Sequence, residues 1–522
     1  MDMVESRRRI ASAFLTDEGP HGSISQRAQE RGVSRQRIYR EAAWVVERLQ
    51  TPDWQRERQA LKEQVRALRQ RVADLEKRSC WTVILDPEKQ AEFASVGQAG
   101  GVSLPEVKQL LQVLLREQTP SVAKLGRWTK AAGEKAAGLL KVIDELARPL
   151  VEVCAADEIY TKAPVLMVVE PESLYWAVGQ KSDTVTGEAW QETFACLPNL
   201  EMVLRDAGSG LTRGVKLANA DRTKQNGKPL VAGQDHFHSF WEGGKGLSRA
   251  ERAAKAALAK AEQVQKEYEK RRRQGQSLSG ITTQVNSLWR KAEQAMDRWS
   301  EREHGWTQAK DALLLVTPAG ELNSPARAEK LVKEALLSLP DADFGKSKRQ
   351  LQQPETFTYL AEVHRKLAAL AAPAEVKAAA VQQECLRRRP ELLQGENTQA
   401  AAMRGVLLLC AVVLAKSSAV GKETAQSVHS IFRSAWRASS LVECLNSVLR
   451  MQQARHRNLS QGLLDLKRLY WNSHAFRTGP RRGKSPYEHL GVRLPAGVSW
   501  WELLKWPPEQ LREKLSMAKI AI

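Results

Sequence analysis

The spacing of the hydrophobic positions changes twice along this chain. Up to about residue 150 the apolar residues recur every three to four positions, which predicts helices. From Val151 to about residue 246, short apolar runs alternate with polar breaks, a pattern typical of strands. From 247 to 430 the helical spacing returns in long charged segments. The pattern therefore predicts a small α/β region with helical regions before and after it.

The first predicted element pair is a helix-turn-helix over residues 24–49. Ala28, Val33 and Ile38 have the spacing of its packing residues, Gly32 falls in the turn, and Ser34 would cap the second helix. That helix would present to the major groove Arg35, Gln36, Arg37, Tyr39 and Arg40. A small amphipathic hairpin with no DNA contact is the alternative interpretation.

A heptad pattern follows the helix-turn-helix. Its apolar positions, spaced by 7, 4, 3, 4 and 3 residues, are Trp54, Leu61, Val65, Leu68, Val72 and Leu75. Charged residues fill the intervening positions, so the segment predicts a short coiled-coil seam that could join two subunits. One long helix packed on its own chain explains the pattern equally well.

A second helical region is expected between residues 80 and 150. Asp86 and Pro87 predict a helix start, and Gly100-Gly101 interrupts the chain. Two helical stretches follow, and the one that begins at Ser121 would expose Lys124 and Arg127. These basic side chains could make it a second recognition helix, and a helical spacer is the alternative.

Three carboxylates lie within or at the end of elements that the pattern predicts. Asp157 lies in the first of three apolar runs, which predict an antiparallel meander. Asp206 ends a fourth run after an intervening helix, and a further helix and a fifth run follow. Glu443 lies in a predicted helix 237 residues after Asp206. If the first and fourth strands are neighbours, the two aspartates lie side by side.

Paired carboxylates of this kind suit phosphoryl transfer assisted by metal ions. Hard divalent cations such as Mg²⁺ take oxygen ligands. Two of them about 3.5–4 Å apart can stabilise the attacking and leaving oxygens of an in-line displacement. Asp157, Asp206 and Glu443 are therefore the expected catalytic residues and ligands of two Mg²⁺ or Mn²⁺ ions.

Composition points to the same class of substrate. The chain has 522 residues and a formal net charge of +20, which favours a polyanionic partner. The six cysteines are scattered without a CxxC pair, as expected in a reducing cytosol. The longest apolar run, residues 406–415, is too short to span a membrane, and no signal peptide is evident. We therefore expect a cytoplasmic protein whose partner is nucleic acid and not a membrane.

These residues resemble the motifs of the DDE transposase and integrase superfamily. The resemblance lies in the Asp157 strand, in the Asp-x-Gly-Ser-Gly-Leu run from Asp206, and in Glu443 with Asn446, Ser447 and Arg450. Residues 235–238 are similar to the [C/D]xxH signature that follows the second aspartate in several transposases. The segment 468–492 resembles the end of insertion-sequence transposases.

The resemblance implies a bacterial, nucleoid-associated protein that binds double-stranded DNA, together with a fold and a set of DNA contacts. The fold is a ribonuclease-H-like catalytic domain that is interrupted by a large all-α insertion before the glutamate. Asp235, His236 and His238 would support the acids. The DNA contacts expected after the second aspartate are Trp241, Asn446, Arg450, Arg455, Arg457, Arg481, Arg482 and Lys484. One subgroup pattern is missing, since Trp436 and Ser439 replace its tyrosine and arginine, so hairpin chemistry is not implied.

The sequence thus predicts a multidomain protein with six segments. They are a helix-turn-helix domain (1–50), a helical linker (51–79), a second helical DNA-binding domain (80–150), a split catalytic domain (151–246 and 431–490), the helical insertion (247–430) and a C-terminal tail (491–522). The expected function is that of a transposase, active as a homodimer or higher oligomer, that cuts transposon terminal inverted repeats and joins them to target DNA. A structure-selective nuclease and an inactive transposase-derived DNA-binding protein are the alternatives.

Overall fold

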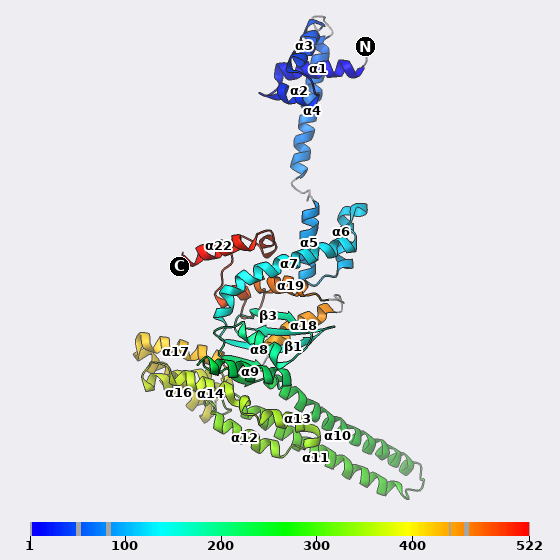
Figure 1. Ribbon diagram of the computed structural model, residues 1–522. Coiled ribbons are helices and arrows are strands. Elements are labelled where there is room, and N and C mark those ends of the chain that lie inside the picture. Colours follow the sequence, from blue (N-terminus) through cyan, green and yellow to red (C-terminus); the bar gives the residue numbers. More distant parts are fainter. Residues whose placement is uncertain (1–2, 49–53, 80–84, 438–439, 454–458, 521–522) are drawn as a thin grey trace. The chain divides into compact units, whose positions relative to one another are not determined.

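A computed structural model describes residues 3–48, 54–79, 85–437, 440–453 and 459–520. The chain divides into two compact units, Met1–Lys89 and Gln90–Ile522. Both are rich in helix, and the only sheet among the described residues is a five-stranded one in the second unit (Figure 1). The coarse prediction of a helix-rich multidomain protein with one small α/β region is confirmed.

The first unit begins with the predicted helix-turn-helix. Its helices are α2 (Ser23–Glu30) and α3 (Arg35–Arg48), and Gly32 in the turn has a φ of +60°. Ala28 and Ile38 are buried between them. Ser34 accepts a hydrogen bond from the Arg37 backbone N–H at 3.4 Å, as expected of a cap.

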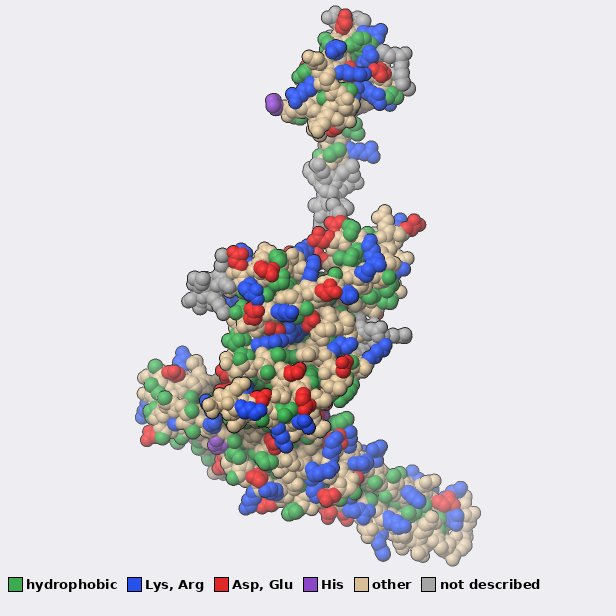
Figure 2. All heavy atoms as spheres, viewed as in Figure 1, with side chains coloured by type: hydrophobic (Ala, Val, Ile, Leu, Met, Phe, Trp, Pro, Cys, Tyr) green, Lys and Arg blue, Asp and Glu red, His purple; other side chains and the backbone are tan. Residues whose placement is uncertain are grey.

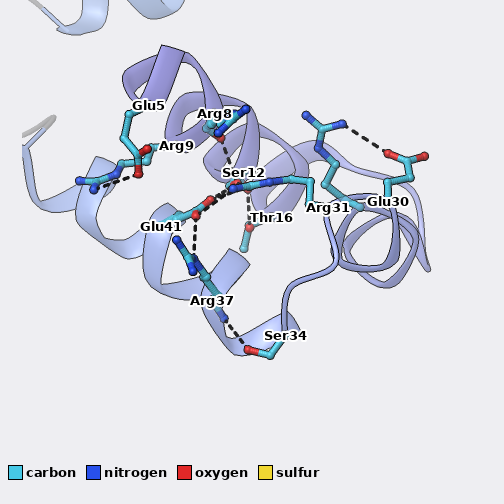
Figure 3. A network of polar contacts seen from close by, with 11 residues as sticks. Glu5, Arg8, Arg9, Ser12, Thr16, Glu30, Arg31, Ser34, Arg37 and Glu41 are labelled. Atoms are coloured by element: carbon cyan, nitrogen blue, oxygen red, sulfur yellow. Dashed lines mark hydrogen bonds and ion pairs between the residues drawn. The ribbon is translucent and has the colours of Figure 1, made fainter. Parts of the chain in front are cut away.

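A further helix, α1 (Met3–Glu18), packs against α3 and completes the small domain. Glu41 of α3 is almost fully buried, and its carboxylate accepts hydrogen bonds from Arg31 at 2.7 and 3.1 Å and from Ser12 at 2.8 Å. Figure 3 shows these side chains converging from three parts of the chain on one carboxylate. The bond with Arg31 is the main reason that the pKa of Glu41 lies below its usual value.

The predicted heptad segment forms a single helix, α4 (Trp54–Ser79). Two ion pairs attach its first turns to α1: Arg58 with Asp17 at 3.2 Å and Lys62 with Glu18 at 3.1 Å. The side chains of Trp54 and Leu75 lie outside the described part of the chain.

The sheet has the strand order β3-β2-β1-β4-β5. Its strands are β1 (Val153–Tyr160), β2 (Pro164–Val169), β3 (Trp176–Lys181), β4 (Met202–Arg205) and β5 (Val231–Gln234). The first three pair antiparallel, whereas β4 lies parallel to both β1 and β5. The predicted meander and the predicted contact between the first and fourth strands are both confirmed.

Helices cover the sheet and form one hydrophobic core with it. They are α7 (Val122–Ala147), α8 (Gly187–Ala195), α9 (Ser209–Lys224), α18 (Ser440–Gln453) and α19 (Gln461–Ser473). The smaller helices α5 (Pro87–Ala99) and α6 (Leu104–Leu115) pack on the start of α7. The second half of α7 packs into the core around the sheet. The helix at residues 122–147 therefore belongs both to the predicted second helical domain (80–150) and to the region of the sheet.

The C-terminal segment is a packed part of the second unit rather than a loose tail. It contains α20 (Pro486–Leu490), α21 (Trp500–Leu503) and α22 (Pro508–Ile520), and Trp500, Leu503 and Leu511 are buried in the sheet core. Short 3-10 turns lie at Arg116–Gln118, Arg148–Leu150, Pro354–Phe357 and Pro390–Leu393.

The predicted insertion is helical in its described residues and has its own hydrophobic cores. Its helices are α10 (His236–Arg273), α11 (Ile281–Ala312), α12 (Pro325–Leu337), α13 (Asp341–Leu351), α14 (Thr358–Ala368), α15 (Ala374–Arg387), α16 (Thr398–Lys416) and α17 (Ser418–Arg433). The first of them begins at His236, about ten residues before the predicted boundary, so one continuous helix leads from the sheet into the insertion.

One helix among the described residues, α16, is long and apolar enough to cross a membrane by length and composition. It packs against α15 and α17 in the insertion, with Cys410 and Leu414 in their shared core. The core helix of a soluble protein can pass the same test, so a single helix of this kind is weak evidence for a membrane span.

The close contact between α7 and α19 gives a test of how tightly these two helices pack. Gly133 meets Gly462 so closely that a Cβ on Gly133 would lie 2.5 Å from the Gly462 carbonyl oxygen. We expect Gly133→Ala to destabilise the second unit by about 1–3 kcal/mol through overpacking, seen as a lower thermal unfolding midpoint. Gly405→Ala on α16 is the matched control, since its added Cβ meets nothing within 4 Å, and it should leave the midpoint unchanged or raise it.

Candidate active site

The parallel pairing of β1 and β4 brings the two predicted aspartates together. Ala156 of β1 pairs with Arg205 of β4. The residues that follow them, Asp157 and Asp206, therefore lie next to each other. Asp206 directly follows β4, and its Oδ1 accepts a hydrogen bond from the Gly208 backbone N–H at 2.8 Å. A Cβ on Gly208 would lie 2.8 Å from the same oxygen. The glycine in the predicted turn thus leaves room for the aspartate.

The third predicted acid comes from α18, which packs on β1 and β2. Val442, Leu445 and Leu449 form its buried face. Glu443 lies at the edge of that face with 20% of its side chain exposed, and its Oε2 accepts a hydrogen bond from Arg450 at 3.0 Å. The helix therefore delivers Glu443 to the side of the sheet where Asp157 and Asp206 lie.

Asn446 has a different place from the one predicted. It is fully buried, and its amide donates a hydrogen bond to Asp157 Oδ2 at 2.7 Å. The predicted direct DNA contact by Asn446 is wrong for this conformation, because its side chain lies behind the aspartate. It orients the Asp157 carboxylate instead. Ser447, on the next position of α18, is exposed.

The three acids and Glu158 form a cluster of like charges. Burial, then the nearby Glu443 and Asp206, raises the pKa of Asp157 to about 8. Burial and the charge of Asp206 raise the pKa of Glu158 to about 7. The sequence analysis missed Glu158. Its position directly after Asp157 on β1 was the available signal, although neighbouring strand residues usually point to opposite faces.

A histidine faces the same cluster from the start of α10. Asp235 caps this helix and is fully buried, and its Oδ2 accepts a hydrogen bond from His238 Nδ1 at 2.5 Å. The other ring nitrogen of His238, Nε2, lies 3.8 Å from Glu443 Oε1. The bond to Asp235 raises the pKa of His238 to about 9. At neutral pH the imidazolium therefore presents positive charge to the acids.

His236 does not belong to this cluster. It is buried in an apolar and aromatic setting, and its Nε2 lies 2.9 Å from the Thr356 carbonyl oxygen. Burial lowers its pKa to about 4, so it is neutral. The predicted supporting role near the acids is wrong for His236 in this conformation. It holds the start of α10 against the Pro354–Phe357 turn of the insertion instead.

The donor set suits a divalent cation, although the acids are engaged with other partners. Among the described residues, no group of three or more His, Cys, Asp or Glu side chains is arranged to hold a metal ion. Asp157 is turned toward Asn446 and Glu443 toward Arg450. However, the buried Glu158 Oε2 has no hydrogen-bond partner. Four crowded carboxylates with an unsatisfied oxygen fit a bound cation of the Mg²⁺ type.

The basic residues predicted to contact DNA divide into three groups. Arg450 is half-exposed, and Arg482 and Lys484 are exposed. Arg481 is partly buried and donates hydrogen bonds to the carbonyl oxygens of Glu172 and Pro171 at 2.6 and 2.9 Å. It therefore holds its loop to the segment before β3, and its contact with DNA stays a prediction. Arg455 and Arg457, like Ser439, lie outside the described residues.

Trp241 extends the site along α10. It lies one turn after His238, is 54% exposed, and has the Lys245 ammonium 3.3 Å from its ring centroid. Such an exposed tryptophan beside a cation offers a stacking surface for a base. Figure 2 shows Lys and Arg side chains spread over the helices of the insertion. Lys346 of α13 lies 3.0 Å from Glu242, the residue after Trp241 on α10.

The predicted recognition residues are accessible on their helices. On α3 the exposed side chains include all five predicted ones: Arg35, Gln36, Arg37, Tyr39 and Arg40. Lys124 and Arg127 are exposed near the start of α7, which Ser121 caps. Arg37 also lies 3.6 Å from Glu41, so it has a structural partner as well.

Comparisons with known proteins leave the site to be interpreted from its geometry. No family model, curated protein or solved structure matches this chain.

The acid cluster predicts an unusual pH dependence of stability. Because the folded pKa of Asp157 lies above its unfolded value near 3.8, the folded state binds more protons than the unfolded state between about pH 4 and 8. The stability that protonation of Asp157 contributes is therefore lost as pH rises through this window. We expect Asp157→Asn to raise the unfolding midpoint at pH 8 and to change it little at pH 4.

Differential scanning fluorimetry from pH 4 to 8, with and without Mg²⁺, would measure this effect. The cation should stabilise the wild type most at high pH, and Asp157→Asn should lose that response. Asp297→Asn, at an exposed position of α11, is the matched control. An identical pH profile for wild type and Asp157→Asn would contradict the proposed charge crowding.

Proposed function

We propose that this protein is a DNA transposase of the DDE type, with a ribonuclease-H-like catalytic domain. The observation that carries the proposal is the parallel alignment of β1 with β4, which sets Asp157 beside Asp206 while α18 supplies Glu443. The strand order β3-β2-β1-β4-β5 supports the proposed fold. The exposed basic residues of α3 support the binding of DNA ends.

In this proposal Asp157, Asp206 and Glu443 hold two Mg²⁺ or Mn²⁺ ions. When bound, such ions stabilise charge on the attacking and leaving oxygens of the scissile phosphate. Asn446 holds the Asp157 carboxylate in one orientation. Arg450 would exchange its ion pair with Glu443 for a contact with the phosphate, which frees the glutamate as a ligand.

His238 has a positioning role in the proposed reaction. Its bond to the buried Asp235 fixes the imidazole at the start of α10, with Nε2 directed toward Glu443. A positive charge there lowers the cost of bringing Glu443 close to the two aspartates. Asp235 therefore acts by positioning His238, and we do not propose it as a metal ligand.

The exposed Trp241 and the basic helices of the insertion would bind DNA next to the acids. We propose that the strands are cut by activated water and that the 3′-hydroxyl is then joined to target DNA. The helix-turn-helix would recognise the terminal inverted repeats, because its exposed side chains are of the types that read phosphates and base edges.

Substitution of the acids tests the chemistry. We expect Asp206→Asn to reduce Mg²⁺-dependent cleavage by more than about 100-fold, since even residues that only orient metal ligands contribute about 10–100-fold. DNA binding should remain. The assay uses DNA that carries the inverted repeats flanking the gene, with the cut positions mapped on both strands. Asp297→Asn, at an exposed position of α11, is the control.

Each outcome of that assay is informative. Cleavage that survives Asp206→Asn would show that the assigned acids are wrong. Cleavage by the wild type without joining to a second DNA would favour a structure-selective nuclease. Binding without any cleavage in Mg²⁺ or Mn²⁺ would favour a DNA-binding protein that has lost catalysis.

The helix-turn-helix makes a separate prediction about salt. We expect the double variant Arg35→Ala and Arg40→Ala to bind the repeat DNA more weakly. The slope of log K against log salt should fall by about 1 for each phosphate contact removed. Fluorescence anisotropy at several salt concentrations would measure it. Arg56→Ala with Arg66→Ala, on the exposed side of α4, should leave the slope unchanged.

A further inference from the structure

The helix α4 has an apolar face that the described residues of its own unit leave exposed. Leu61 is 44%, Leu68 is 61% and Val72 is 52% exposed. Val65 is half-buried and shares a surface cavity with Phe14 of α1. Three large apolar side chains at heptad spacing, in contact with water, favour burial against a partner helix.

The attachment of α4 to α1 leaves this face open. Arg58 and Lys62 bond to Asp17 and Glu18 near the end of α1, and the cavity beside α1 is otherwise lined by polar residues of α4 such as Arg66 and Gln70. These contacts fix the orientation of α4 within the unit. Leu61, Leu68 and Val72 remain available to another chain.

The identity of the apolar residues specifies the number and direction of helices. In the heptad register, Val65 and Val72 occupy a positions, and Leu61 and Leu68 occupy d positions. β-Branched residues at a with leucine at d favour parallel two-stranded coiled coils over trimers and tetramers.

The charged positions that flank the seam favour a second copy of the same helix. In a parallel, in-register pair, Glu57 at a g position lies opposite Lys62 at the e position of the other copy. Lys62 also pairs with Glu18 of its own chain at 3.1 Å, so in the dimer it would be shared between the two carboxylates. By sequence, Arg71 at g likewise lies opposite a glutamate at position 76. An antiparallel pair would instead bring Lys62 of one copy near Arg69 of the other, which is repulsive.

We propose that the α4 helices of two copies form a parallel, in-register, two-stranded coiled coil. This arrangement places the two helix-turn-helix domains at the same end of the coil, since α1–α3 precede α4 in both copies. The consequence for DNA rests on the proposed function: the two domains would bind neighbouring half-sites rather than distant ones. The dimer itself does not depend on DNA or catalysis.

Analytical ultracentrifugation of the full chain without DNA tests the dimer. We expect the wild type to sediment as a dimer and the double variant Leu68→Glu and Val72→Glu as a monomer. Both positions are exposed in the single chain, so the variant should keep its far-ultraviolet circular dichroism spectrum. Ala60→Glu with Ala67→Glu adds the same charge on the outer face of α4 and should leave the dimer intact.

Two results would overturn the proposal. One is a wild type that stays monomeric at the highest soluble concentration. The other is a double variant that keeps the wild-type mass, which would assign the contact to another surface. Neither result bears on Asp206→Asn, whose cleavage defect should be independent of mass, so the two proposals can fail separately.

Cross-linking tests the direction of the helices. In a Cys80→Ser background, we expect Val72→Cys to form a disulfide-linked dimer on mild oxidation, because a positions face each other in a parallel in-register pair. Ala67→Cys, on the outer face, should not. A dimer by mass in which Val72→Cys cross-links no faster than Ala67→Cys would contradict the parallel register.

Discussion

The repulsion among the carboxylates around Asp157 of β1, next to the end of β4, is the constraint around which the second unit is arranged. Asp157 is 6% exposed and lies close to three other acids. A folded chain tolerates such crowding only if protons, hydrogen-bond donors or cations compensate the charge. Asn446, Arg450 and His238 each provide part of that compensation, and they come from α18 and α10, which cover different parts of the sheet.

The same constraint explains why the insertion is tied so closely to the sheet. Thr358 at the start of α14 donates a hydrogen bond to the Ala232 carbonyl oxygen of β5, and His236 lies 2.9 Å from the Thr356 carbonyl oxygen. Arg205, at the end of β4, is buried and lies 3.7 Å from Glu355. The helical insertion therefore forms one wall of the site and fixes the end of the sheet where the acids lie.

Much of this arrangement could be predicted from local sequence patterns, because those patterns reflect local physics. The alternation of apolar and polar residues predicts the strands, and the Asp206-x-Gly turn marks the end of β4. The partners of the acids could not be predicted in the same way. Asn446 has the helical spacing of an exposed phosphate contact, yet the packing of α18 on β1 turns it inward. Likewise, Arg481 lies in a basic loop, but its bonds to Pro171 and Glu172 depend on contacts more than 300 residues away in sequence.

The continuity of α10 has a mechanical consequence. The helix begins beside the acids at His236 and runs without interruption to Arg273, a length of about 57 Å at 1.5 Å per residue. Along most of that length α11 packs against it as an antiparallel strut (Figure 1). A paired rod of this kind resists bending, so the basic tip at residues 270–273 is held at a set distance from His238.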